Sequence, residues 1–328
     1  MLRSCIIFYC LLLMSFPALA LETDQYMSWN VDLRDSREAV NNYVNSKMLL
    51  KLKRPSIQRA GSCLLAARRV IRIFRRPFFQ IIEQWAETSP EVDVFPPRNY
   101  SGSYRNESIY VKNVFPFILP MARNMNVNGV YFGTDKLGHF ISFGVRYYGI
   151  YHRAITHGAD EKTAFKKVVD FGLMSEVDLV GKIITGVLSF GDLEANFQGM
   201  LFFRSLCDST SAFHLKKDES NGWTLSGKFD IAQYVNGDWD ESYNESGFTR
   251  ARWTGSNGLN QTLRKYCEAR NSSRVLQRFE HYQNSFSRSF SQSLILDLEN
   301  GGVFNHRRDY NFANACSNVL ISGTPDNN

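Results

Sequence analysis

Two short motifs place polar side chains four residues apart within apolar sequence. They are Asp-Lys-Leu-Gly-His-Phe at 135–140 and Gly-Asp-Leu-Glu-Ala-Asn at 191–196. Residues four apart lie on one face of an α-helix, so each motif predicts a helix that carries a polar pair. The pairs are Asp135 with His139 and Asp192 with Asn196. Because an unpaired polar group is costly inside a protein, we expect the two pairs to face one another.

Glu176 lies between the two motifs, which makes five candidate site residues: Asp135, His139, Glu176, Asp192 and Asn196. Carboxylate, imidazole and amide groups are metal ligands, so the five could hold a divalent metal ion. A carboxylate could equally hold His139 in one tautomer as a general base. The third alternative is a hydrogen-bonded network that fixes the register of packed helices. The sequence leaves open whether the chain is an enzyme and which metal it would bind.

Helical periodicity around the motifs predicts a mainly α fold with a helical bundle core. We expect three consecutive helices between about residues 135 and 206, starting near Asp135, Glu161 and Ser189, with short connections that favour antiparallel packing. Glycine is costly inside a helix, and close helix contacts would explain why it recurs along this segment. These glycines are Gly133, Gly138, Gly144, Gly149, Gly172, Gly181, Gly186 and Gly199.

The flanking sequence predicts further helices and little sheet. Helical periodicity covers residues 35–52 and 62–85, with a break at Pro55 and a bend at Pro77. Residues 276–298 carry an aromatic stripe at helical spacing, which is typical of a core-facing helix. Residues 223–235 alternate enough to form a small β-hairpin or an extended segment in the C-terminal third.

The N-terminus has the pattern of a secretory signal peptide at residues 1–20. Arg3 supplies the positive charge, residues 5–16 are apolar, and Ala18-Leu19-Ala20 predicts cleavage after Ala20. An exported chain of this kind is expected in the bacterial periplasm or outside the cell. Residues 21–328 are then expected to form a single mostly helical domain. Its parts are N-terminal helices and a loop (21–125), the motif-bearing core (126–207) and a C-terminal α+β extension (208–328).

Four cysteines remain after cleavage: Cys63, Cys207, Cys267 and Cys316. In an oxidising compartment they can form two disulfide bonds in three pairings. We favour Cys267 with Cys316, because both lie in the C-terminal third, which leaves Cys63 with Cys207. The spacing is too wide for a zinc knuckle.

The positive charge is concentrated in one segment, since no acidic residue occurs between Glu38 and Glu83. Its basic residues are Lys47, Lys51, Lys53, Arg54, Arg59, Arg68, Arg69, Arg72, Arg75 and Arg76. Without these ten and Arg3, 27 basic residues face 32 acidic ones, so the basicity is local.

Within this segment, residues 64–78 predict a basic amphipathic helix whose anion-binding candidates are Arg68, Arg69, Arg72, Arg75 and Arg76. One hypothesis is attraction to an anionic membrane surface or envelope polymer. The alternative is that the arginines meet acidic residues of the same chain, such as Asp238, Asp240 and Glu241. A nucleic-acid partner is not expected for an exported chain without a recognition motif.

No serine-hydrolase elbow, nucleotide-binding Walker loop or His-Glu-x-x-His zinc motif occurs in the chain. The order of the two motifs with Gly172 and Glu176 between them resembles that of VanZ-like membrane proteins and the short periplasmic lipoproteins of the YfiM type, over about residues 134–199. The chain also resembles a group of exported bacterial proteins. The segments that carry this resemblance are Thr23-Asp24-Gln25-Tyr26, residues 130–136, residues 191–196 and residues 240–244.

The resemblance implies a helical hairpin core and a role in the cell envelope, but no established catalytic mechanism. The VanZ-like family is associated with glycopeptide resistance, whereas this chain lacks its membrane-spanning apolar segments. We therefore expect an exported envelope protein, accessory or structural, with a buried polar network. The alternative is a periplasmic hydrolase or transferase, metal-dependent or acid–base, that acts on a lipid or cell-wall intermediate.

Overall fold

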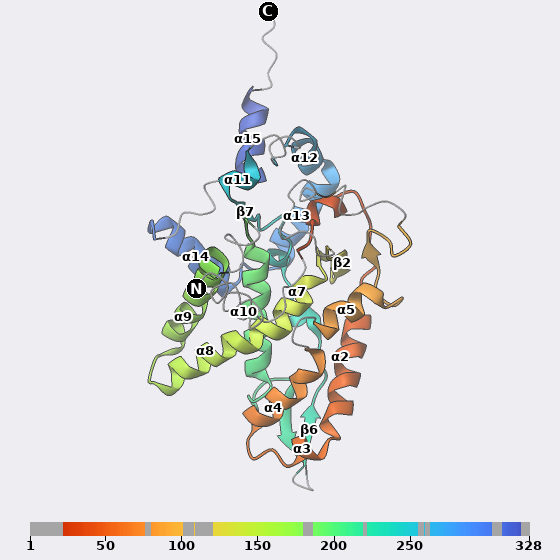
Figure 1. The fold of residues 1–328 in the computed structure, drawn as a ribbon, viewed down its shortest axis with the longest axis vertical. Coiled ribbons are helices and arrows are strands. Elements are labelled where there is room, and N and C mark those ends of the chain that lie inside the picture. The colour runs from red at the N-terminus through yellow and green to blue at the C-terminus, as the bar shows by residue number, and fades with distance from the viewer. Residues whose placement is uncertain are drawn as a thin grey trace, which may run out of the picture.

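The computed structural model describes residues 22–75, 80–100, 108, 121–179, 186–218, 222–254, 259, 263–303 and 310–322. The predicted signal peptide, Arg76 and Pro77 lie outside these residues. The described chain is mainly α-helical with a few short strands, which confirms the predicted fold class (Figure 1). No helix in it is both long and apolar enough to cross a membrane.

The three predicted central helices are present. The first is continuous from α7 (Asp135–Gly138) through a π-helical turn, η3 (His139–Phe143), into α8 (Gly144–Thr156). The second, α9 (Glu161–Met174), ends in another π-helical turn, η4 (Ser175–Leu179). The third is α10 (Phe190–Ser205), which starts where the Ser189 side chain accepts a hydrogen bond from Asp192 N. Helix α8 packs on both α9 and α10.

Two of the glycines allow a close helix contact, as predicted. A Cβ on Gly199 would lie 1.8 Å from the Phe140 carbonyl oxygen, and one on Gly144 would lie 2.5 Å from the Gly199 carbonyl carbon. The backbones of α10 and of the η3–α8 segment therefore touch directly, which a larger residue would prevent. Gly149 lies on the same helix as Gly144, but a Cβ there would meet nothing within 4 Å, so close packing does not explain it.

The N-terminal part begins with η1 (Gln25–Ser28) and continues with α2 (Arg37–Leu52), α3 (Pro55–Gln58), α4 (Cys63–Ile71), η2 (Arg72–Phe74) and α5 (Ile81–Thr88). The predicted break at Pro55 is confirmed. The prediction of one bent helix over 62–85 is wrong, because α4 ends at Ile71 and Arg75 bridges to Gln80 before α5 begins. The apolar stripe of the predicted basic helix is buried at Ala67, Ile71 and Phe74.

A small antiparallel sheet leads into the first central helix. Its order is β1 (Val94–Phe95), β2 (Asn124–Val127) and β3 (Val130–Gly133), and only Thr134 separates the end of β3 from Asp135. Asn128 and Gly129 between β2 and β3 both have positive φ, as a type I′ hairpin turn requires. This hairpin fixes where the helix that carries Asp135 and His139 begins.

Two further strand pairs occur. The hairpin of β5 (His214–Lys217) and β6 (Trp223–Ser226) confirms the strand predicted near 223, although Ile231–Gln233 is a 3-10 turn, η6. A short pair joins β4 (Val187–Leu188) to β7 (Gly247–Phe248). The segment between these pairs contains the 3-10 turn η7 (Gly237–Trp239).

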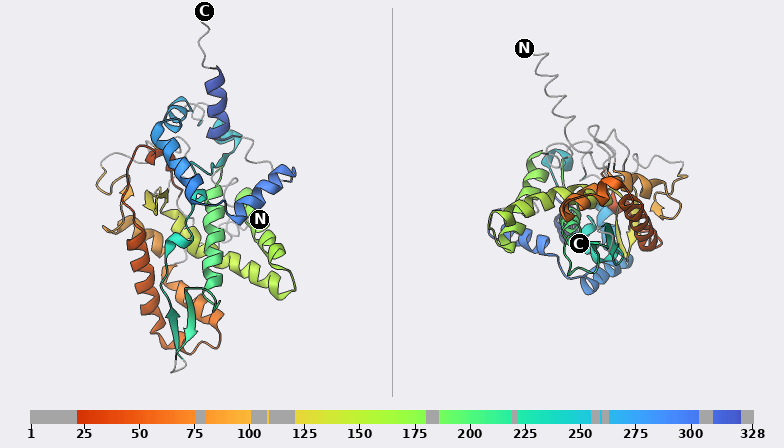
Figure 2. Two further views of the ribbon diagram at one scale, coloured as in Figure 1. Left: turned by 180° about the vertical axis from the view of Figure 1, so that it is seen from behind. Right: turned by 90° about the horizontal axis from the view of Figure 1, so that it is seen from below.

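The C-terminal part consists of α11 (Arg250–Trp253), α12 (Leu263–Arg270), α13 (Ser273–Ser285), α14 (Phe290–Asn300) and α15 (Phe312–Ser322). The prediction of one helix over 276–298 is wrong, because α13 ends at Ser285 and Ser289 caps a new helix. Helices α12 and α15 lie at the end of the molecule opposite α3 and β6 (Figures 1 and 2). Disulfide bonds join Cys63 to Cys207 and Cys267 to Cys316, which confirms the favoured pairing.

Candidate functional site

The side chain of Lys136 lies at the centre of the candidate site. It is 0 % exposed, and its Nζ lies 2.7 Å from Asp135 Oδ2, 2.7 Å from Asp192 Oδ1 and 2.6 Å from Glu241 Oε1. Removing a lysine ammonium from water is costly unless carboxylates compensate its charge. The three acidic residues come from the start of α7, the first turn of α10 and the segment after η7, so one ammonium links three parts of the chain.

His139 lies between two partners on α10. Its Nε2 is 3.3 Å from Asp192 Oδ2, and its Nδ1 is 3.1 Å from Asn196 Oδ1. The Asn196 amide in turn donates to the Tyr147 hydroxyl at 3.3 Å. Because both ring nitrogens have partners, the orientation of the imidazole is fixed. Four of the five candidates from the sequence, all except Glu176, therefore lie in one cluster.

Glu176 lies close enough to influence this cluster without bonding to it. Within the described residues, no hydrogen bond or ion pair links Glu176 to the other four candidates. Burial raises the pKa of Glu176 well above its ordinary value, and the charges of Asp192 and Glu22 raise it further. Burial likewise raises the pKa of Glu22, again with a contribution from Asp192. A charged Asp192 therefore favours the protonated form of both carboxyl groups.

The carboxyl groups around Lys136 differ in the direction in which their pKa values are shifted. Burial would raise the pKa of Asp192, but His139 and Lys136 together hold it below its ordinary value. Burial raises the pKa of Glu241 to about 7, although Lys136 opposes the shift. Burial also works against a charged Lys136, yet Asp135, Asp192 and Glu241 raise its pKa well above the ordinary value. The three carboxyl groups therefore favour the charged form of the lysine in this site.

Asp135, His139 and Asp192 have the composition of a metal site. One ligand atom from each can be chosen so that all three lie within 4.8 Å of one another, and all three residues are buried. Two carboxylates and an imidazole suit a divalent ion. The Lys136 ammonium, however, already contacts both carboxylates, so an ion bound here would face its positive charge at close range.

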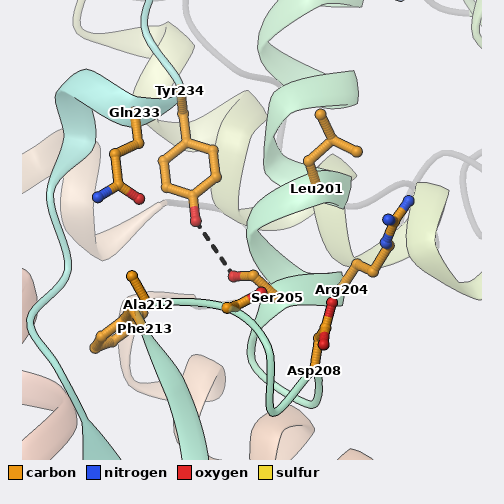
Figure 3. A pocket seen from close by; sticks show the side chains of 9 residues that line it. Leu201, Arg204, Ser205, Asp208, Ala212, Phe213, Gln233 and Tyr234 are labelled. Atoms are coloured by element: carbon orange, nitrogen blue, oxygen red, sulfur yellow. Dashed lines mark hydrogen bonds between the residues drawn. The ribbon is translucent and has the colours of Figure 1, made fainter.

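The cluster has little access to solvent. His139 is 6 % exposed and Asp192 is 5 % exposed. Two surface cavities lie elsewhere. The one in Figure 3, about 270 Å³, is lined by the end of α10 and by Phe213 and Tyr234, and the Tyr234 hydroxyl lies 3.2 Å from Ser205 Oγ. The other, about 470 Å³, lies between α2 and Asp230.

Sequence reasoning did not select Lys136, Thr23 or Glu241 as site residues. The Thr23 hydroxyl donates to Asp135 Oδ1 at 2.7 Å, and the Ser189 hydroxyl donates to Glu241. The backbone N–H of Glu241 donates to the side chain of Gln25. A signal for them existed, because the segments Thr23–Tyr26 and Asp240–Asn244 belong to the motif set described above, and both meet the Asp135–His139 segment here.

The acidic cluster at 238–241 does not neutralise the basic helix. Glu241 pairs with Lys136, and Asp240 accepts hydrogen bonds from Ser242 and Tyr282. Within the described chain no acidic residue forms an ion pair with the anion-binding candidates Arg68, Arg69, Arg72 or Arg75, whereas Arg76 lies outside it. The predicted pairing with Asp238, Asp240 and Glu241 is therefore wrong for these four arginines, since all three acidic residues are buried and none forms an ion pair with them in the described chain.

Comparison with known proteins gives no match to a protein-family model, a curated protein or a solved structure. The proposals for function below are therefore based on the geometry of the buried cluster and of the protein surface.

Proposed function

We propose that this chain is an exported protein of the bacterial cell envelope with an accessory or structural role, whose buried polar cluster stabilises the fold. The observation that carries the proposal is the Lys136 ammonium, fully buried within 2.7 Å of Asp135, Asp192 and Glu241. The lysine supplies the positive charge that a metal ion would otherwise supply. The carboxylates are thus compensated by the chain itself.

The position of the cluster favours a structural role. Hydrogen bonds and ion pairs of the cluster join four segments that are far apart in sequence. These segments contain Thr23, the α7 motif, the α10 motif and Glu241. A network of this kind specifies which segments pack together, because any other packing would leave buried charges without partners.

Export is supported by the two disulfide bonds and by the leader-like sequence at residues 1–20. Disulfides form and persist in the periplasm and outside the cell, and they are rare in the reducing cytosol. The proposed envelope role further agrees with the motif order, which resembles that of VanZ-like and YfiM-type proteins.

The test is thermal unfolding of Asp135→Asn and His139→Ala, with and without EDTA or added zinc. Each substitution should lower stability by about 1–3 kcal/mol, because it leaves buried partners unsatisfied. The chelator and the metal should not change the result. His157→Ala, at an exposed position just after α8, is the control and should unfold like the wild type. Unchanged stability in both buried variants would refute a structural role for the cluster.

A second candidate function is a periplasmic hydrolase or transferase acting on a lipid or cell-wall intermediate. It is favoured by the two π-helical turns, since His139 starts one and Glu176 lies in the other. Such turns are rare and occur frequently at functional sites. In this hypothesis His139 is the base or a metal ligand, Asp135 and Asp192 are ligands, and Glu176, whose pKa burial raises, is the acid.

Metal analysis tests the metal-dependent form of the second candidate. The purified wild type would carry one divalent ion per chain if that form holds, and His139→Ala would lose it. A wild type without bound metal after exposure to zinc or manganese would remove the metal-dependent form of this hypothesis. Acid–base chemistry without a metal would instead require that His139, now 6 % exposed, reach a substrate.

A further inference from the structure

The end of the molecule formed by α2, α3, α4 and the β5–β6 hairpin carries the excess positive charge (Figures 1 and 2). We call residues 47–75 of this region the basic end. Lys53, Arg54 and Arg59 are exposed around α3, and Arg68 and Arg72 are exposed on and just after α4. The described basic residues of the sequence segment are thus carried by α2, α3, α4 and the turns between them, and Arg76 lies outside the described residues.

These charges crowd one another instead of pairing with acids. Burial lowers the pKa of Lys51, and the positive charges of Arg54 and Arg72 lower it further. Within the described residues, no ion pair joins the basic end to a carboxylate. Two acids near the β5–β6 hairpin form local hydrogen bonds, since Asp208 accepts from Thr210 and Asp218 accepts from Gly222. The positive potential is therefore directed outward.

Large apolar side chains are exposed among these charges. Leu49 is 50 % exposed, Leu50 is 59 % exposed, and Leu65 at the start of α4 is 39 % exposed. On α2 the buried face consists of Val40, Val44, Met48 and Leu52, so Leu49 and Leu50 lie on the opposite side of its last turns. Exposed leucines next to arginines and lysines are typical of surfaces that enter the lipid headgroup region.

The basic end is held rigidly in this form. The Cys63–Cys207 disulfide fixes the start of α4 to the residues after α10. Gln58 donates to the backbone oxygens of Leu52 and Trp223 at 2.7 and 2.8 Å, which ties α3 to α2 and to β6. The leucines are therefore presented by a fixed scaffold, and little ordering is needed when a partner binds.

We propose that the basic end binds a bilayer surface that contains anionic phospholipid, with Leu49, Leu50 and Leu65 entering the headgroup region. The basic residues supply the attraction to lipid phosphates, and the leucines supply the apolar contact. An acidic polymer would match the charges but would give the three leucines no apolar phase. The proposal does not depend on the role of the Lys136 cluster.

The test is co-sedimentation of the oxidised, signal-peptide-free chain with vesicles of phosphatidylcholine, with or without about 30 % phosphatidylglycerol. The wild type should bind only the anionic vesicles and should be released at about 0.5 M sodium chloride. Arg54→Glu combined with Arg59→Glu should weaken binding at least about tenfold. The matched control, Lys162→Glu with Lys167→Glu, changes the net charge equally at exposed positions of α9 and should weaken it much less.

A second pair of variants tests the apolar contact. Leu49→Gln with Leu50→Gln should weaken binding about fivefold or more. Leu276→Gln with Leu296→Gln, which changes two exposed leucines on α13 and α14, should leave binding unchanged. The proposal is overturned if the wild type does not bind anionic vesicles. It is also overturned if the double substitution at Arg54 and Arg59 and the control substitution at Lys162 and Lys167 weaken binding equally. It is also overturned if the leucine pair binds normally, since a purely electrostatic surface would then serve an acidic polymer. Circular dichroism of each variant checks that the fold is retained.

Discussion

The buried cluster around Lys136 and the basic end are both rich in charged side chains, but they treat those charges in opposite ways. Lys136 has three carboxylate oxygens within 2.7 Å and no exposure. Arg54, Arg59 and Arg72 are exposed, and no acid within the described chain forms an ion pair with them. A cation thus contributes to folding where the chain encloses it with acids, and it remains available to a partner where the chain does not.

The largest effect should come from removing the central cation. Lys136→Met leaves Asp135, Asp192 and Glu241 buried without their shared partner, so the free energy of unfolding should fall by about 3–5 kcal/mol. Urea unfolding measures the change. Lys162→Met on the exposed side of α9 should stay within about 0.5 kcal/mol of the wild type. If the two variants unfold alike, the contrast between buried and exposed lysines fails.

The next effect is a pH dependence of stability that should arise at the buried cluster. Burial raises the pKa of Glu241 to about 7. The positive charge of Lys136 opposes this shift, and the negative charges of Asp192 and Asp135 add to it. Between its ordinary pKa and 7 the folded state keeps a proton that the unfolded state releases, so stability should fall as pH rises through this window. The loss should be on the order of 3 kcal/mol between pH 5 and pH 8.

Unfolding of the wild type and of Glu241→Gln at both pH values checks this prediction. The variant should lose most of the dependence assigned to Glu241, and the raised pKa values of Glu22 and Glu176 should account for a remainder of the same sign. A wild type equally stable at both pH values would contradict the assignment.

A smaller effect should follow from disturbing the helix contact that positions the cluster. Gly199→Ala would place a methyl group 1.8 Å from the Phe140 carbonyl oxygen, so α10 must move away from the helix that carries His139. We expect a loss of about 1–3 kcal/mol. Gly149→Ala on α8 meets nothing within 4 Å and should instead stabilise by about 0.5–1 kcal/mol. Thermal melts of the two variants should shift in opposite directions.

The smallest effect on stability should occur at the basic end. Arg54→Glu with Arg59→Glu removes charges that lack an acidic partner, so the free energy of unfolding should change by no more than about 0.5 kcal/mol. A large loss would show that these arginines support the fold. Their role would then resemble that of Lys136, and the proposed division between the two regions would disappear.

Local sequence was sufficient for much of the helical core. Asp135, His139, Asp192 and Asn196 were placed on facing helices because polar pairs at four-residue spacing in apolar sequence permit little else. Glycines at 144 and 199 pointed to a close contact because glycine is costly in a helix. Helix ends were predicted less well, since residues 276–298 form two helices separated at the Ser289 cap.

Partners that are remote in sequence could not be derived in this way. Nothing near Lys136 indicates that Glu241, more than a hundred residues away, will accept its charge. Local periodicity also gave no reason to bring Thr23 to Asp135. Such contacts depend on how separate helices pack, and a spacing rule within one helix carries no information about them.

Local sequence patterns are enough to predict the helical character of the core, the polar pairs that are buried in it, the paired cysteines and the segment that holds the excess positive charge. Which of the charges are neutralised depends instead on how the helices pack. The tertiary structure encloses Lys136 among three carboxylates and leaves the basic end without an acidic ion-pair partner in the described chain. The physical reason is that the cost of a charge depends on the distance to its partners and to water, and both distances are set by packing.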